Sequence, residues 1–65
     1  MKYIVRYTNN AFESNSRNVR RHIRELDEDY VRVENKYGEF ICEGARNWDG
    51  TVNVITRERY GWIWG

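Results

Sequence analysis

SNSRNVRRHIRELDED, residues 14–29, is the stretch that decides the fold, because it carries the only strong helical signal in the chain. Its apolar residues Val19, Ile23 and Leu26 follow the i, i+4, i+7 spacing of one helix face. The rest of the chain reads as short strands and turns. This one helix is therefore expected to cover the sheet that the strands form, with its apolar stripe facing inward.

Strands are predicted on both sides of the helix, where apolar and polar residues alternate with the period of two of a half-buried strand. Such runs occupy residues 2–8, 30–34, 39–43 and 51–57, and residues 60–64 form a possible further strand. The two middle runs flank a turn that ends in a glycine, which makes them the clearest hairpin. Five Tyr, three Trp and many β-branched residues, against a single Leu, also favour strands.

The connection between the first strand and the helix is predicted to be irregular. Asn9 and Asn10 are expected to end the strand, because Asn favours turns. Residues 11–15 then lead into the helix. Either Ser14 or Ser16 is expected to cap its start, with the hydroxyl oxygen accepting a hydrogen bond from an amide of the first turn.

The predicted order of elements is therefore β-α-β-β-β, with one more strand possible at the end. A single helix packed on one face of an antiparallel sheet of four, possibly five, strands is the layered arrangement that this order allows, so the predicted fold class is α+β. The chain has no Pro, internal repeat or low-complexity segment. At 65 residues it is expected to form one compact domain, residues 1–65.

Composition narrows the classes of partner. Eleven basic and ten acidic residues give a formal net charge of +1, far from the basic balance of a dedicated nucleic-acid binder. Electrostatic recognition must therefore come from local patches. The chain has a single cysteine, no apparent signal peptide, and no apolar run of about 20 residues, the length needed to cross a bilayer. A cytoplasmic protein without membrane contact is expected.

Catalytic and metal-binding patterns are missing from the sequence. His22 and Cys42 are the only His and Cys, and no spacing pairs them as base and nucleophile. We expect His22 at the edge of the apolar stripe and Cys42 as a small buried residue on the same face as Phe40. Asp27 and Asp29 lack the further ligands of a calcium loop. No enzyme activity, metal or cofactor is predicted.

Basic residues of the helix form the most informative charged pattern. They follow i, i+3, i+4, i+7 spacing and are expected to point away from the sheet: Arg17, Arg20, Arg21 and Arg24. As a plain solvated face they would pair through Arg21–Glu25 and Arg24–Glu28. However, the arginines lie toward the positive end of the helix dipole and the acids toward its negative end. A charge order that opposes helix stability indicates use by a partner.

Exposed aromatic residues are the second candidate for a binding surface. Tyr37 falls in a turn, Trp48 in a polar loop, and Trp62 and Trp64 near the end of the chain. Tyr, Trp and Arg are enriched at the energetic centres of protein interfaces. Aromatic rings also stack on nucleic-acid bases, so the residue types alone leave both uses open.

The sequence therefore predicts a small protein-binding module that acts as a regulator, inhibitor or adaptor by blocking a surface of its partner. Phages and other mobile elements often encode domains of this size, which is an association rather than a property of the residues. Nucleic-acid binding through Arg17, Arg20, Arg21 and Arg24, with aromatic stacking, is the alternative. Self-association through a sheet edge or an uncovered sheet face is a third possibility.

Overall fold

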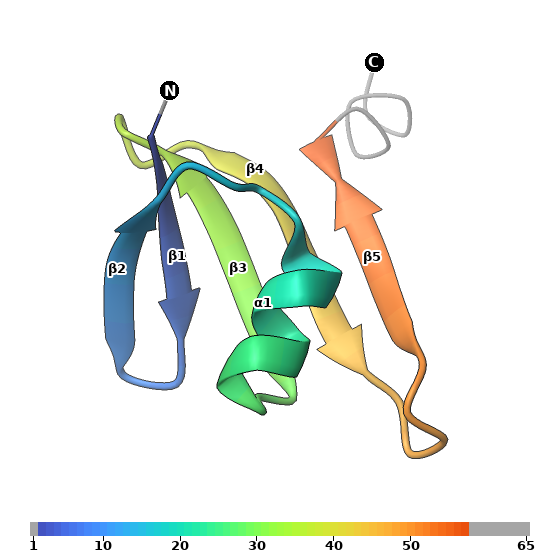
Figure 1. Ribbon diagram of the computed structural model, residues 1–65. Coiled ribbons are helices and arrows are strands. Elements are labelled where there is room, and N and C mark those ends of the chain that lie inside the picture. Colours follow the sequence, from blue (N-terminus) through green and yellow to red (C-terminus); the bar gives the residue numbers. More distant parts are fainter. Residues whose placement is uncertain (1, 58–65) are drawn as a thin grey trace.

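The computed structural model describes residues 2–57 and shows one helix packed on an antiparallel sheet of five strands (Figure 1). The predicted α+β fold class is confirmed. The elements, in chain order, are β1 (Tyr3–Tyr7), β2 (Asn10–Ser14), α1 (Val19–Leu26), β3 (Tyr30–Asn35), β4 (Phe40–Arg46) and β5 (Val52–Thr56). Across the sheet the strands lie in the order β2-β1-β3-β4-β5, so β2 and β5 are the edge strands of the part of the sheet that residues 2–57 form.

Strand β2 is the element that the sequence analysis missed, because it assigned these residues to a turn and a lead into the helix. It pairs antiparallel with β1, with Val5 opposite Phe12. Thr8 and Asn9 form a two-residue loop between the strands, and Thr8 adopts a left-handed φ of 49°. The element order is thus β-β-α-β-β-β. The possible strand at 60–64 lies outside the described residues.

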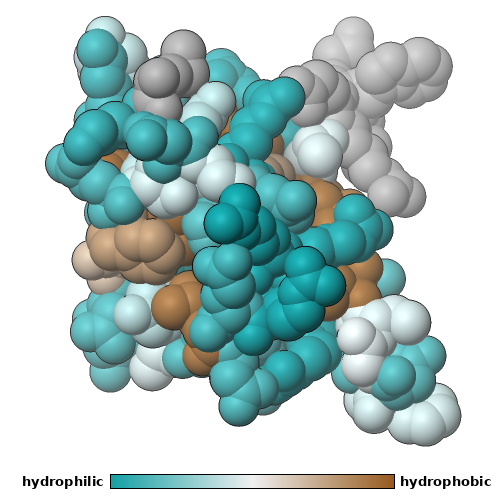
Figure 2. Space-filling model, in the orientation of Figure 1, coloured by the Kyte–Doolittle hydropathy of each residue, from teal (hydrophilic) through white to brown (hydrophobic). Residues whose placement is uncertain are grey.

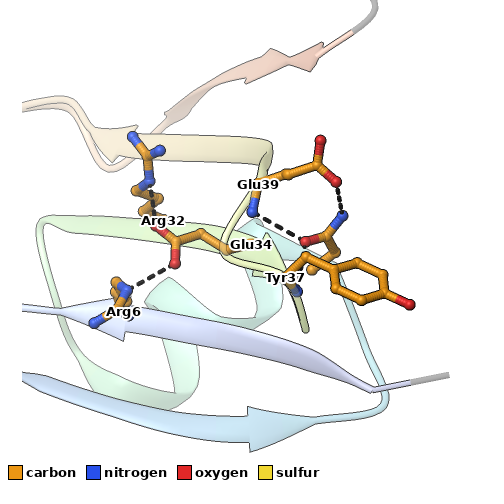
Figure 3. A network of polar contacts seen from close by, with 6 residues as sticks. Arg6, Arg32, Glu34, Tyr37 and Glu39 are labelled. Atoms are coloured by element: carbon orange, nitrogen blue, oxygen red, sulfur yellow. Dashed lines mark hydrogen bonds and ion pairs between the residues drawn. The ribbon is translucent and has the colours of Figure 1, made fainter.

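The two faces of the sheet differ in character. Val5, Val31 and Val33 are fully buried between the sheet and α1, as the alternation of β1 and β3 predicts. Their neighbours Arg6 and Arg32 point to the other face, which α1 does not cover. There both guanidinium groups hydrogen-bond to the carboxylate of Glu34 (Figure 3).

A bulge in β4 changes the face of one predicted residue. Val33 pairs with Cys42 and Glu34 pairs with Phe40, so Ile41 is an extra residue on β4. The extra residue places Phe40 on the uncovered face, under the guanidinium of Arg32, while Cys42 stays on the side of the helix. The expectation that Phe40 and Cys42 share a face is therefore wrong.

Helix α1 is shorter than the predicted 14–29. Asn18 caps its start, and its side-chain oxygen accepts from the amide of Arg21 at 3.2 Å. Ser14 and Ser16 are not caps, because their hydroxyl groups accept from the amides of Ser16 and Asn18 and so fix the connection before the helix. Asp27 ends α1 in the left-handed conformation, with φ 53°.

The helix lies close to the sheet where β4 has a glycine. A Cβ atom on Gly44 would lie 3.0 Å from side-chain atoms of both Val19 and Ile23, and 3.2 Å from Val52. The predicted stripe faces the sheet, with Val19 and Ile23 buried and Leu26 partly buried. Within residues 2–57, no helix has the length and apolar character needed to cross a membrane.

Candidate interaction surface

The four arginines of the predicted basic stripe are all exposed, and they line different cavities of the surface. Arg17 precedes the cap of α1, and the other three lie on the helix. Successive helical residues turn by about 100°, so Arg20, Arg24 and Arg21 spread in that order over about 100° of the side of α1 that faces away from the sheet. Arg20 and Arg24 line one cavity, and Arg21 lines a different hollow with Phe12 and His22.

Arg21 forms an ion pair with an acidic residue of the same helix. Its Nε donates to Glu25 Oε1 at 2.7 Å, and this hydrogen bond holds the pKa of Glu25 below its ordinary value. The predicted Arg24–Glu28 pair is not formed. Glu28 lies beyond the end of α1, and its carboxylate accepts from the hydroxyl group of Thr8 instead.

The other three arginines of the predicted stripe have no such ion pair among residues 2–57. None of the side chains of Arg17, Arg20 and Arg24 forms an ion pair with any residue in the range 2–57. The observed ends of α1 place only one of the two helix arginines in this group, Arg20 and not Arg24, where the helix dipole disfavours a cation. Arg20 falls in the first turn, where a cation is unfavourable by about 0.3–1 kcal/mol, but Arg24 falls in the last turn, where a cation is favourable.

The same three residues border an open groove between α1 and β5. One cavity of about 480 Å³ has Arg17 and Arg20 along the helix side and Val54 and Thr56 along β5. A neighbouring cavity of about 680 Å³ also includes Arg20. We call these two cavities together the α1–β5 groove.

The second cavity continues along the same two elements. It is lined by Arg20 and Arg24 on the helix and by Val52 on β5, and it reaches the loop that precedes β5 through Gly50. Figure 2 shows apolar surface between the hydrophilic helix and β5. The groove therefore has a basic wall on α1 and a largely apolar wall on β5.

The groove exists because α1 covers only part of the sheet. The helix packs mainly over β3 and β4, and β5 lies beyond them at the sheet edge (Figure 1). Val52 and Val54 on β5, and Ile41 on β4, point to the helix side but are only partly buried. These side chains form the apolar lining of the groove.

Acidic groups near the groove are already paired. Arg46, at the end of β4, binds Asp27 through Nη1 at 3.0 Å and Asp29 through Nη2 at 2.8 Å. Asp27 borders the second cavity together with Arg46. Both carboxylates therefore have an ion-pair partner in Arg46, whereas Arg20 and Arg24 form no ion pair with any residue in the range 2–57.

The predicted aromatic residues lie apart from one another. Trp48 is 99% exposed in the loop between β4 and β5, whose residues Gly50 and Thr51 line the second cavity. Tyr37 is 75% exposed in the turn between β3 and β4, at the opposite end of the sheet (Figure 1). Trp48 is therefore near the α1–β5 groove and Tyr37 is not. Trp62 and Trp64 lie outside the described residues.

His22 and Cys42 are both buried and both bind backbone carbonyl groups. The Nε2–H of His22 donates to the carbonyl oxygen of Ser16 at 2.9 Å, and its ring meets Phe12 edge-on. The thiol of Cys42 donates to the carbonyl oxygen of Arg17 at 3.4 Å. Both side chains thereby tie the segment before α1 to the fold.

Within residues 2–57, no three His, Cys, Asp or Glu side chains gather as metal ligands.

The groove itself was missed by the sequence analysis. The alternation of β5 places Val52 and Val54 on the helix side, but only the short length of α1 and its position over β3 and β4 leave them partly open.

The comparisons found no protein-family model, no curated protein and no solved structure that matches this chain.

Proposed function

We propose that this protein is a non-catalytic protein-binding module whose contact surface is the basic wall of the α1–β5 groove. The observation that carries the proposal is the row of Arg17, Arg20 and Arg24 along an open groove. These exposed cations have no ion-pair partner in the range 2–57. The module acts as a regulator, inhibitor or adaptor by covering a surface of its partner.

The residue types of the surface suit a protein partner. Arg and Trp are enriched at the energetic centres of interfaces, and Trp48 stands fully exposed in the loop beside the groove. A partly buried hydrogen bond between a guanidinium group and a carboxylate contributes roughly 1.5–3 kcal/mol. Two or three such bonds and burial of the apolar lining are the contributions that would offset the cost of association.

Nucleic-acid binding is the alternative, and the same arginines support it. Trp48 in the loop beside the groove offers one ring for base stacking, whereas no aromatic side chain is among the described residues that line the groove itself. Against it, the formal net charge of +1 is far from the basic balance of a dedicated nucleic-acid binder. A mobility-shift titration at low salt tests this alternative. Duplex binding should weaken with salt with a log–log slope near −0.9 per neutralised phosphate.

Affinity capture with a charge-reversed variant tests the proposed function. Arg20→Glu with Arg24→Glu should lose the partner that the unaltered chain captures from its source cell. The matched control is Lys2→Glu with Lys36→Glu, because both lysines are exposed and lie outside the groove. Either double reversal changes the net charge from +1 to −3, by four units. Equal capture by both variants would refute the proposal.

A further inference from the structure

We infer that the α1–β5 groove binds an extended segment of a partner protein in which acidic and apolar residues alternate. This inference rests on the proposed function and adds the chemistry of the ligand. Its occupant is identified by the two unlike walls of the groove: guanidinium groups on α1 and partly buried apolar side chains on β5.

The spacing of the two walls fits an extended chain. Arg20 and Arg24 are four residues apart on a helix, which is a rise of about 6 Å. Val52 and Val54 are two residues apart on one face of a strand, which is about 6.6 Å. In an extended peptide, side chains of one face also repeat every two residues, about 6.6 Å apart. Successive acidic residues can therefore meet successive arginines while the alternate residues meet β5.

The charge of the groove selects the acidic component. Arg17, Arg20 and Arg24 line it, and the nearby Asp27 and Asp29 both pair with Arg46, so that these three side chains together carry one net negative charge against the three positive charges of the wall. Carboxylates that enter the groove form charge-assisted hydrogen bonds, which are about twice as strong as neutral ones. A basic segment would meet like charges instead.

The apolar wall of the groove favours apolar residues as the second component of the ligand. Val52, Val54 and Ile41 are partly buried, so a ligand that covers them removes apolar surface from water. A purely acidic chain would leave this surface wet and would place its own charges beside it. An alternating sequence presents one face to each wall.

Fluorescence anisotropy with labelled synthetic peptides tests the inference on the full chain. The first probe is a short peptide that alternates Asp and Val, with both ends blocked. Two reference probes are a peptide of the same composition in which all Asp precede all Val, and an oligomer of Asp alone. We expect the alternating peptide to bind about tenfold or more tightly than either reference, and its affinity to fall with salt.

Neighbouring residues of β5 provide the matched variants. Val54 lines the groove, and Asn53 points to the other face of the same strand. Val54→Glu should weaken binding of the alternating peptide about tenfold or more, and Asn53→Glu by less than about twofold. Thr56→Glu, which also lines the groove, serves if Val54→Glu unfolds the protein. Thermal unfolding checks that each variant is folded.

Equal affinity for the alternating and block-ordered peptides would overturn the inference, as would tighter binding of the Asp oligomer. Single-stranded DNA is a further probe, and its tighter binding would also overturn the inference. So would binding of the alternating peptide that neither Val54→Glu nor Thr56→Glu weakens. Binding only after Trp62→Ala with Trp64→Ala would mean that the end of the chain itself occupies the groove, and would overturn it too. If the captured partner still depends on Arg20 and Arg24 while no peptide binds, the proposed function stands and this inference alone fails.

Discussion

Glu34 accepts a hydrogen bond from Arg6 across the boundary between β3 and β1, with 2.8 Å between Arg6 Nε and Glu34 Oε1. Its second oxygen accepts from Arg32 at the same distance (Figure 3). Glu34 is only 7% exposed although it lies on the face that the helix leaves uncovered. Two guanidinium groups thus bind a nearly buried carboxylate on this face, and one of them, that of Arg32, lies over the ring of Phe40.

Replacing this carboxylate should destabilise the fold. Glu34→Gln leaves Arg6 and Arg32 without their anionic acceptor, and hydrogen bonds to charged groups contribute roughly 1.5–3 kcal/mol each. Because both arginines are partly exposed and can turn to water, we expect the free energy of unfolding to fall by about 1–3 kcal/mol in urea denaturation. Glu13→Gln is the control, since its ion pair with Lys2 is exposed and should contribute less than about 1 kcal/mol.

Acid should remove the contribution of Glu34. The hydrogen bond from Arg6 comes first among the causes that hold the pKa of Glu34 below its ordinary value of 4.5, and the bond from Arg32 adds to it. A carboxyl group whose pKa is lower in the folded state contributes stability that is complete above the unfolded value. That contribution is lost as the pH falls through the folded value. The stability difference between the unaltered chain and Glu34→Gln should therefore be constant near neutral pH and shrink below about 4.5. A difference that grows on acidification would contradict this assignment.

Gly44 should tolerate no larger side chain. A side chain there would push Val19 and Ile23 away from the sheet, and overpacking of this kind costs roughly 1–3 kcal/mol. We expect Gly44→Val to lower the thermal unfolding midpoint accordingly. Ala45→Val makes a similar change at an exposed position on the other face of β4 and should alter stability by no more than about 0.5 kcal/mol. Equal midpoints for the two variants would mean that α1 does not lie closely on β4.

The cap of α1 gives a further test of its boundaries. Asn18→Ala removes the side-chain acceptor for the amide of Arg21 and should destabilise the protein by about 0.5–2 kcal/mol. Asn18→Asp keeps the acceptor and adds a favourable negative charge at the start of the helix, so it should be neutral or stabilising. Urea denaturation of both variants separates the two effects. If Asn18→Ala leaves the stability unchanged, the side chain of Asn18 does not cap the helix.

The spacing of apolar residues was sufficient to predict the elements that bury one face against the core. Val19, Ile23 and Leu26 identified the helix and its buried face, and Val31 and Val33 identified the inner face of β3. The same kind of pattern could not find β2. Asn10, Ala11, Glu13 and Ser14 have low strand propensity, and their strand is specified by its pairing with β1.

Local sequence also could not reveal the division of the arginines. The spacing of Arg17, Arg20, Arg21 and Arg24 predicts exposure, which the structure confirms. Which of them borders a groove depends on where the helix starts and on which strands it covers, and both are tertiary properties. The pairing of Arg46 with Asp27 and Asp29, residues far apart in sequence, is likewise set by the fold.

The most direct test of the central claim compares two adjacent arginines. Arg20 borders both cavities of the α1–β5 groove, whereas Arg21 lines neither of them and is paired with Glu25. Arg20→Glu and Arg21→Glu make the same change in charge one residue apart. We predict that Arg20→Glu raises the dissociation constant of the captured partner by about tenfold or more, as expected for loss of a charge-assisted hydrogen bond, and that Arg21→Glu raises it by less than about threefold. Equal loss from both variants, or a larger loss from Arg21→Glu, would contradict the groove as the binding surface.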